Sequence, residues 1–155
     1  MEGNPLVSVI INCFNGEEFL REAIDSVLAQ TYTHWEIIFW DNQSTDATAE
    51  IVKSYTDSRI RYYYAPNHTP LGEARNLAVE KTKGEYINFL DADDIWMPNK
   101  LEEQIKLIEP GVWLIVDTCW HTNFIEDMLD VVTLTILYHY RVDERNGVIE
   151  VNALD

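Results

Sequence analysis

The stretch Tyr86-Ile87-Asn88-Phe89-Leu90-Asp91-Ala92-Asp93-Asp94 decides the fold of this chain, because a short apolar run stops there abruptly at three acids. The run follows Gly84, and its apolar residues predict a buried strand with the acids at its carboxyl end. In an open α/β sheet, ligands bind outside the carboxyl ends of the strands. We therefore expect the ligand site of this protein to lie around Asp91 and Asp93.

One small residue separates Asp91 from Asp93, so the two carboxylates can point at a common position. Their negative charges repel one another unless a cation lies between them. Mg²⁺ and Mn²⁺ prefer oxygen ligands and are commonly held by one or two carboxylates together with the phosphates of a substrate. The pair therefore predicts a site for Mn²⁺ or Mg²⁺ beside a phosphate-bearing substrate.

Length and charge limit the class of protein. A chain of 155 residues with 46% hydrophobic residues is long enough for one globular domain with a buried core. Its formal net charge of −16 argues against nonspecific binding to nucleic acid or to an anionic membrane surface, because both need clustered Lys and Arg. The same charge makes a multiply charged phosphate compound hard to bind without a metal.

The two cysteines, Cys13 and Cys119, do not make a disulfide framework, and a reducing compartment fits them best. The first residues do not resemble a signal peptide, and no stretch approaches the roughly 20 apolar residues that span a bilayer. We therefore expect a cytoplasmic protein without an integral membrane segment, and peripheral attachment to a membrane stays open.

Apolar periodicity predicts strands and helices that alternate, which is typical of a mostly parallel sheet covered on both faces. The side chains of Ser44, Thr45 and Asp46 are candidates to cap the second helix. The expected strands are 6–13, 35–40, 60–65 and 86–90, and the expected helices are 19–30, 47–55, 71–81 and 100–108.

The pattern is weaker beyond residue 110. Two further stretches, Val112 to Val116 and Val131 to Tyr140, have strand-like composition. Arg145-Asn146-Gly147 is typical of a hairpin turn.

Four motifs together resemble the nucleotide-sugar half of a family 2 glycosyltransferase, the inverting group with the GT-A fold, over the range Pro5 to about Glu109. Each motif is a weak signal by itself, but their order and intervals make the resemblance strong. The motifs are Val7-Ser8-Val9-Ile10-Ile11-Asn12-Cys13-Phe14-Asn15, Trp40-Asp41-Asn42-Gln43-Ser44-Thr45-Asp46, Gly72-Glu73-Ala74-Arg75-Asn76 and Asp91-Ala92-Asp93-Asp94.

The resemblance implies an α/β, Rossmann-like GT-A domain with three layers, α/β/α, and a mostly parallel sheet. It implies one domain over residues 1–155, with 5–110 as the nucleotide-sugar-binding part and 111–155 as a divergent C-terminal segment. On the family pattern, residues 131–146 would form the next strand and turn, and 111–130 would be an insertion. The implied reaction is metal-dependent, inverting transfer of a sugar from a nucleoside-diphosphate sugar to a hydroxyl of an unknown glycan, lipid or protein acceptor.

The resemblance also implies roles for residues in the first half of the chain. Asn12 and Phe14 would contact the nucleotide base. Where the family usually has two adjacent acids, one of which recognises the base, this chain has Asp41 and Asn42. Because an amide both donates and accepts hydrogen bonds, the exchange leaves the identity of the base open.

Arg75 lies near the start of a helix that Pro70 opens, and the free N–H groups of a helix start favour phosphate. The resemblance places Arg75 near the donor diphosphate, whereas an arginine on a solvated helix face is the simpler alternative. His68, in the preceding loop, is interpreted as a loop histidine rather than a base.

Among the acids, the resemblance makes Asp93 the direct metal ligand, with Asp91 assisting. Asp94 either joins them or caps the following region. Glu126-Asp127 resembles a later family pair whose aspartate is the catalytic base, which makes Asp127 the candidate base, although two acids on a helix are far more often part of a solvated face.

Three other functions are compatible with parts of the pattern. A truncated nucleotide-sugar-binding domain without transferase activity would keep the same motifs and lack a competent base. A metal-dependent nucleotidyltransferase would release pyrophosphate. A receiver-like phosphoacceptor domain also gathers acids at strand ends, but the segment from Gly72 to Asn76 has no place in it.

Overall fold

The computed structural model describes residues 4–107, 114–117, 138–142 and 149–153, with side chains described through residue 106. Strands and helices alternate through the first 107 residues, close to the ranges that the periodicity predicts. They are β1 (Val7–Cys13), α1 (Leu20–Leu28), β2 (Trp35–Asp41), α2 (Thr48–Lys53), β3 (Ile60–Tyr64), α3 (Leu71–Val79), β4 (Tyr86–Phe89) and α4 (Lys100–Leu107). Three further strands follow: β5 (Leu114–Asp117), β6 (Tyr138–Val142) and β7 (Ile149–Ala153).

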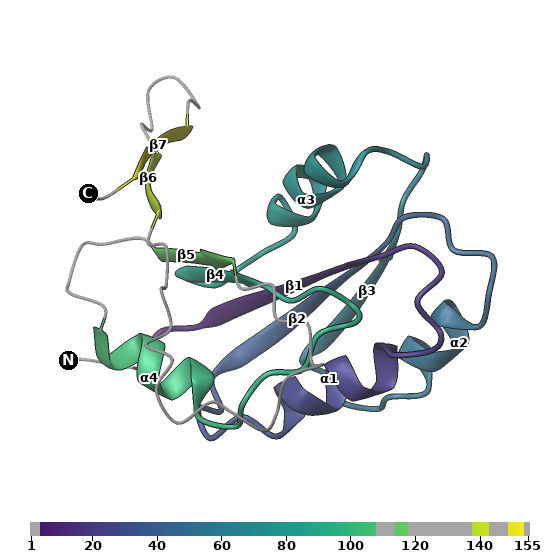
Figure 1. Cartoon of the computed structure of the whole chain (residues 1–155), viewed down its shortest axis with the longest axis horizontal. Coiled ribbons are helices and arrows are strands. Elements are labelled where there is room, and N and C mark those ends of the chain that lie inside the picture. The colour runs from purple at the N-terminus through teal and green to yellow at the C-terminus, as the bar shows by residue number, and fades with distance from the viewer. Residues whose placement is uncertain (1–3, 108–113, 118–137, 143–148, 154–155) are drawn as a thin grey trace, which may run out of the picture.

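The strands form one sheet in the order β3-β2-β1-β4-β5-β6-β7. The pairs from β3 to β5 are parallel, and β6 and β7 add antiparallel strands at one edge. Helices α1, α2 and α4 cover one face of the sheet and α3 covers the other (Figure 1). The expected three-layer α/β fold with a mostly parallel sheet is therefore confirmed.

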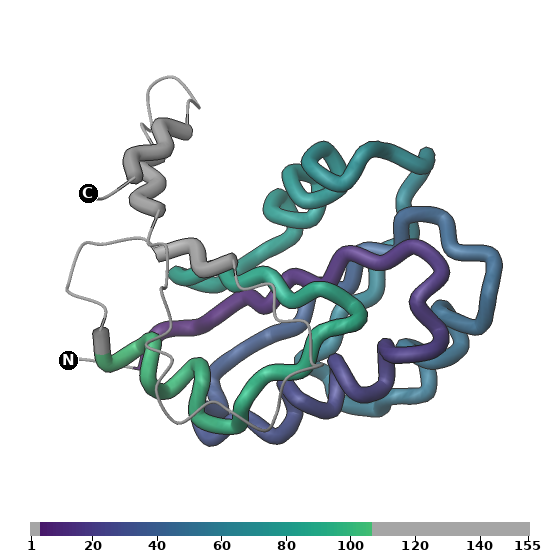
Figure 2. The backbone as a smooth tube through the Cα atoms, in the orientation of Figure 1, coloured from purple at the N-terminus to yellow at the C-terminus, as the bar shows by residue number. Residues whose placement is uncertain are grey.

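Parallel pairing puts the loops after β1, β2, β3 and β4 at one end of the sheet. The tube in Figure 2 shows the purple β1 segment running between β2 and β4 toward that end. The β1 register pairs Cys13 with Asp41 and Ile10 with Phe89, so the residues after these strands begin close together. The loops that follow the four strands therefore meet at the carboxyl end of the sheet, where the sequence predicts the ligand site.

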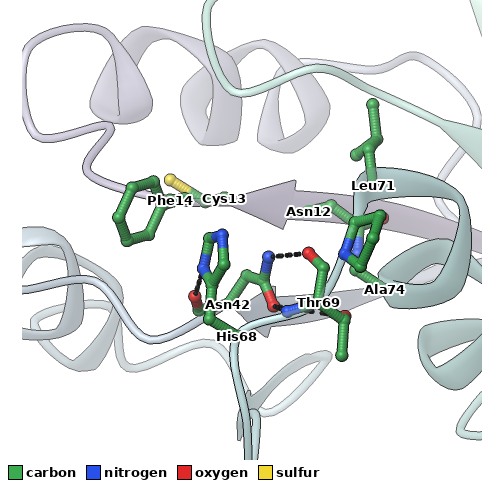
Figure 3. Close-up of a pocket in the computed structure, with 9 residues that line it drawn as sticks. Asn12, Cys13, Phe14, Asn42, His68, Thr69, Leu71 and Ala74 are labelled. Atoms are coloured by element: carbon green, nitrogen blue, oxygen red, sulfur yellow. Dashed lines mark hydrogen bonds between the residues drawn. The ribbon is translucent and has the colours of Figure 1, made fainter.

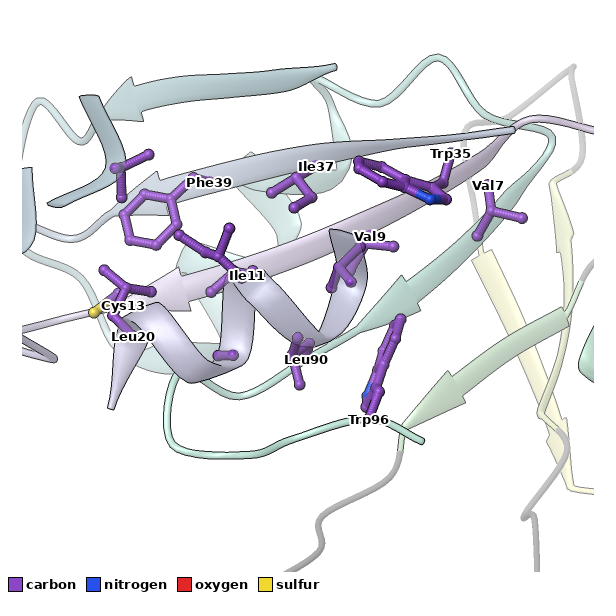
Figure 4. Close-up of a cluster of buried hydrophobic side chains, with 14 of the residues drawn as sticks. Val7, Val9, Ile11, Cys13, Leu20, Trp35, Ile37, Phe39, Leu90 and Trp96 are labelled. Carbon is purple, nitrogen blue, oxygen red and sulfur yellow. The ribbon is translucent and has the colours of Figure 1, made fainter. Parts of the chain in front are cut away.

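The main core lies on the face that α1 covers. Side chains of alternate β1 and β2 residues point into it, and Leu90 and Trp96 close it on the side of the loop after β4 (Figure 4). Burying each large apolar side chain contributes about 1.5–3 kcal/mol to folding. The labelled β1 and β2 residues of this cluster are Val7, Val9, Ile11, Cys13, Trp35, Ile37 and Phe39.

A smaller apolar cluster lies beneath α3 on the opposite face. Ile10 and Ile38 of the sheet pack there against Ala74 and Ala78 of the helix. Because these helix residues are small, α3 can lie close to the strands. The apolar β1 residues 9–11 are fully buried, as expected for a strand covered on both faces.

The amino end of the sheet carries a buried charge. The Glu36 carboxylate accepts hydrogen bonds from Ser8 Oγ (2.8 Å), the Lys83 main-chain N–H (2.7 Å) and Arg61 Nη1 (2.8 Å). Burial alone would raise the pKa of Glu36, but these three hydrogen bonds and the Arg61 charge outweigh burial and hold the pKa below its ordinary value of 4.5. Gly84 fits here because an added Cβ would lie 2.6 Å from Ser8 N.

Two sequence-based expectations hold only in part. Of the candidate caps, Asp46 does accept from the Thr48 N–H at the start of α2 (3.0 Å), whereas Ser44 Oγ accepts from the Asn15 N–H in the loop after β1. The range 111–130 is not simply an insertion, because β5 lies within it and pairs in parallel with β4. The expected hairpin turn at 145–147 lies outside the described residues, but β6 and β7 on either side of it are antiparallel.

Within the described residues, none of the helices has the length and apolar character needed to cross a membrane.

Candidate functional site

The carboxyl end of the sheet holds two adjoining cavities, of about 250 Å³ and about 370 Å³. They share Asn12, Cys13 and Phe14 on one side and Leu71, at the start of α3, on the other. The first cavity extends toward the loops after β2 and β3. The second extends toward the acids that follow β4.

Paired loops build the wall of the first cavity (Figure 3). The Asn42 side chain donates from Nδ2 to the Thr69 carbonyl (2.7 Å) and accepts from the Thr69 N–H at Oδ1 (3.1 Å). His68 Nδ1 lies 2.8 Å from the Asn42 carbonyl oxygen. The imidazole also contacts the Phe14 ring edge to face, with centroids 4.5 Å apart. The loop after β3 is thereby fixed to the loop after β2.

Asn12 carries polar atoms without partners. Both its amide nitrogen and its amide oxygen are buried and make no hydrogen bond within the part of the chain that the structure describes. Such atoms normally have a partner, and leaving one unpaired costs about 1–3 kcal/mol. Because Asn12 lines both cavities, a ligand with a donor and an acceptor could satisfy it.

The second cavity is lined by acids, with an arginine close by. Asp91, Ala92 and Asp93 form one wall, and a turn closed by the Asp94 N–H and the Asp91 carbonyl (3.0 Å) follows β4 directly. Arg75 Nη2 lies 2.9 Å from Asp91 Oδ1, and the guanidinium also lies over the Phe89 ring. Asp93 is exposed, whereas Asp94 is buried.

Side chains join the loop after β1 to the loop after β2 and make this end of the sheet rigid. Asn15 has a φ of 55°, a left-handed conformation that asparagine tolerates better than most residues. Its main-chain N–H donates to Ser44 Oγ (3.0 Å), and its Oδ1 accepts from the Thr45 N–H (2.8 Å). Further bonds run from Gly16 N to Thr48 Oγ1, from Glu17 N to Asp46 Oδ2 and from Ala47 N to Glu17 Oε2.

The family model of glycosyl transferase family 2 matches residues 8–128, which is most of the chain and includes every residue of both cavities. The chain belongs to glycosyl transferase family 2. The expected family resemblance is therefore confirmed.

Individual relatives agree with this assignment. The chain is 42% identical over 103 residues to the Escherichia coli protein UDP-Glc:alpha-D-GlcNAc-diphosphoundecaprenol beta-1,3-glucosyltransferase WfgD. It is 27% identical to S. aureus TarS 1–349 in complex with UDP-GlcNAc, with a TM-score of 0.62 over 64% of the chain. It is 25% identical to the mannosyltransferase PcManGT from Pyrobaculum calidifontis in complex with GDP-Man and Mn²⁺, with a TM-score of 0.68 over 76% of the chain.

These relatives are longer proteins. The match covers 66% of this chain but only 41% of WfgD, and it covers 30% of the TarS chain and 36% of the PcManGT chain. The chain therefore spans less than half the length of each of them.

The donor set of this family 2 chain fits a divalent metal. Among the described residues, no group of three or more His, Cys, Asp or Glu side chains is arranged to hold a metal. Asp91 and Asp93 nevertheless line one wall of the second cavity, and one or two carboxylates are what Mg²⁺ uses when substrate phosphates supply other ligands. The residues thus suit an ion that arrives with a phosphate, rather than one held by protein alone.

The structure separates Asp41 from the other expected donor-binding residues. Asp41 is fully buried and does not line either cavity. Its Oδ1 accepts from the Ser44 N–H (2.7 Å), and its Oδ2 accepts from the Tyr62 hydroxyl (2.6 Å). Asn42 does line the first cavity, but its side chain is occupied by Thr69. Asp41 therefore shapes the turn, and Asn42 positions the opposite loop.

The other expected site residues differ in which cavity they line and in whether the structure describes them. Asn12 and Phe14 line both cavities, Asp91 and Asp93 line the second, and Arg75 lies against Asp91. The candidate base Asp127 lies outside the described residues, so the structure does not test it.

Sequence reasoning missed the place of His68 in the cavity wall. Its partner there is a main-chain carbonyl, which leaves no mark in the sequence. Cys13, which also lines both cavities, does not act as a thiolate, because burial chiefly raises the pKa of its thiol to about 11.

Proposed function

We propose that this chain is the donor-binding part of an inverting glycosyltransferase that uses a nucleoside-diphosphate sugar and a divalent metal. We also propose that residues 1–155 form a single domain, with 5–110 as the donor-binding part. The observation that carries the proposal is the pair of adjoining cavities, one with the unpaired Asn12 amide and one with Asp91, Asp93 and Arg75 at its wall.

The nucleoside would occupy the first cavity. Phe14 offers a ring that is 52% exposed, which is unusual for an aromatic side chain and suits stacking on a base. Asn12 would supply hydrogen bonds from its unpaired amide, and Asn42 would hold the far wall in place through Thr69. The complexes of relatives with UDP-GlcNAc and GDP-Man support a nucleotide in this family.

The diphosphate would occupy the second cavity. Asp93 and Asp91 would hold Mn²⁺ or Mg²⁺, which, when bound, supplies positive charge that stabilises the leaving diphosphate. Arg75 adds a fixed positive charge on the same side of the site, where it would also favour charge developing on the leaving group. The complex of PcManGT with Mn²⁺ supports a metal of this kind.

Inversion requires a base on the side of the sugar opposite the diphosphate, within hydrogen-bond reach of the acceptor hydroxyl. The described acids near the site are engaged in loop contacts or in the proposed metal site, so we propose that the base lies after residue 110. Asp127 is the candidate. Asp127→Asn should abolish transfer and leave donor binding unchanged, because the amide keeps the size of the side chain but does not take the proton.

Calorimetric titration of nucleoside diphosphates tests the proposal. Without a cation, two carboxylates and a diphosphate repel each other, so binding should be at least tenfold tighter with Mn²⁺ or Mg²⁺ than with chelator. Asp93→Ala should remove this difference and leave the fold intact, since it deletes one of two repelling charges. The exposed acid Glu103, replaced by Ala, is the matched control and should keep the full metal effect. Equal affinity with and without metal in the unmodified chain would refute the metal site.

A donor-binding fragment without transferase activity is the second candidate function. The observation that favours it is that the described acids near the site are already engaged, Asp41 and Asp46 in loop contacts and Asp91 and Asp93 at the wall of the second cavity. Transfer and donor hydrolysis, measured with a radiolabelled donor across a broad acceptor screen, separate the two candidates. Donor binding without transfer to any acceptor would support the fragment.

A further inference from the structure

His68 has a defined tautomer in the wall of the first cavity. Its Nδ1 lies 2.8 Å from the Asn42 carbonyl oxygen, and a carbonyl oxygen only accepts hydrogen bonds. Nδ1 must therefore carry the proton and donate it. In the neutral imidazole the other nitrogen, Nε2, then has a lone pair and acts as an acceptor.

The geometry leaves Nε2 on the cavity side of the ring. Figure 3 shows that this nitrogen lies on the opposite side of the imidazole from the Asn42 carbonyl, in the direction of Phe14 and Cys13. Both of those residues line the same cavity. The edge-to-face contact with Phe14, at 4.5 Å between centroids and 62° between planes, holds the ring in this orientation.

Most other polar side chains of this wall are already used. The Asn42 amide is paired on both sides with the Thr69 main chain, so it has little capacity to recognise a ligand. The Asn12 amide is unpaired, but both of its polar atoms are buried. His68 is exposed, and its Nε2 is an acceptor within reach of an entering ring.

We propose that His68 selects the donor's base: its Nε2 accepts a hydrogen bond from the N3–H of a uracil that lies against Phe14. This inference rests on the proposed binding of a nucleoside-diphosphate sugar. Uracil carries a hydrogen at N3, whereas cytosine has a lone pair there that would face the Nε2 lone pair. Guanine also carries a ring N–H, and PcManGT is in complex with GDP-Man. WfgD, which is named for UDP-Glc, has the higher sequence identity to this chain of the two, at 42% against 25%, and therefore favours uracil.

Calorimetry on the full chain in Mn²⁺ tests this with UDP, CDP and 3-methyluridine diphosphate, in which a methyl group replaces the N3 hydrogen. The unmodified chain should bind UDP about fivefold or more tightly than either analogue, the effect expected for one net hydrogen bond. His68→Phe keeps an aromatic ring against Phe14 but removes the acceptor. It should weaken UDP binding about fivefold and leave 3-methyluridine diphosphate unchanged, so that the preference disappears.

His34→Phe is the matched control. His34 also places Nδ1 against a main-chain carbonyl, that of Asn4, but it lies just before β2, at the other end of the sheet from the cavities. This variant should keep the full preference for UDP. Loss of preference in both variants would overturn the inference, because the effect would not be specific to His68.

Nitrogen-15 NMR of the unmodified chain tests the tautomer without any substitution. The His68 spectrum should show a protonated Nδ1 and an unprotonated Nε2, whose resonance shifts when UDP is added. A protonated Nε2, or a His68→Phe variant that still prefers UDP, would overturn the inference and leave the proposed function intact. Binding of GDP but not UDP would overturn the uracil assignment alone, and failure to bind any nucleoside diphosphate would overturn both proposals.

Discussion

The buried carboxylate of Glu36 gives the sharpest prediction about stability. Its Oε1 accepts from Ser8 Oγ and the Lys83 N–H, and its Oε2 accepts from Arg61 Nη1. In Glu36→Gln, the amide oxygen can keep the first two bonds, but the amide nitrogen then faces the guanidinium of Arg61. The substitution therefore exchanges one charged hydrogen bond for two donors that face each other.

The size of the effect follows from the burial of the two partners. A hydrogen bond to a charged group contributes about 1.5–3 kcal/mol, and breaking a fully buried ion pair costs about 3–5 kcal/mol. The Glu36 side chain is 9% exposed, but that of Arg61 is 26% exposed, so solvent can replace part of the lost interaction. We expect Glu36→Gln to lower the free energy of unfolding by about 2–3 kcal/mol at pH 7.

The effect should depend on pH. Because the pKa of Glu36 is lower in the folded than in the unfolded protein, its ionised form stabilises the fold above the ordinary pKa of 4.5. That contribution is lost as the pH falls from 4.5 through the folded-state pKa. The difference in stability between the unmodified chain and Glu36→Gln should therefore be constant from pH 7 to about 5 and shrink at lower pH.

Urea unfolding, followed by tryptophan fluorescence between pH 3 and 7, measures this difference. Glu102→Gln is the control, since Glu102 makes solvent-exposed contacts with Lys106 and Thr31 and its loss should have little effect on stability. Nucleotide binding should be unchanged in Glu36→Gln, because Glu36 lies at the amino end of the sheet. A loss below about 0.5 kcal/mol at pH 7, or a difference that does not shrink in acid, would refute the argument.

Three further predictions concern single residues. Gly84→Ala should lower the free energy of unfolding by about 1–3 kcal/mol, because its Cβ would lie within 2.7 Å of the main-chain atoms Ser8 N and Leu6 O. Gly72→Ala is its control in the same urea titration and should be neutral or slightly stabilising, since there is open space around Gly72 in α3. Asn42→Asp should cost about 1–2 kcal/mol and weaken nucleotide binding, because a carboxylate would face the Thr69 carbonyl; unchanged calorimetric affinity would contradict this. The Cys13 thiol, with a pKa raised to about 11, should not react with a thiol reagent at pH 8 until urea unfolds the chain.

Much of the fold could be predicted because strands and helices have different apolar periods. The eight elements from β1 to α4 fall where the pattern places them, with differences of a few residues at their ends. The cap of α2 could be predicted only in part. Asp46 does cap the helix through the Thr48 N–H, but the loop after β1 also lies within reach, and its N–H groups bond to the other oxygen of Asp46 and to Ser44 Oγ.

The acid wall of the site was predictable for a related reason. Asp91 and Asp93 come directly after a strand, so chain connectivity alone places them at the carboxyl end of the sheet. The Arg75 contact needed more, because Arg75 lies on α3 and its contact with Asp91 depends on how that helix packs against the sheet. The motif resemblance predicted that Arg75 lies near the donor diphosphate, whereas the apolar periodicity gave no such prediction.

The different positions of Asp41 and Asn42 show where sequence reasoning reaches its limit. In a half-exposed strand, alternation of polar and apolar residues tells which face each side chain meets. β2 is buried on both faces, so its residues are apolar on either side and the alternation is absent. Only the packed structure shows that Asp41 lies on the α1 face with Phe39, where Tyr62 of β3 reaches its carboxylate. Asn42 then begins the loop and turns toward the cavity, so neighbouring residues of one motif have separate roles, one in holding the turn and one in shaping the proposed nucleotide site.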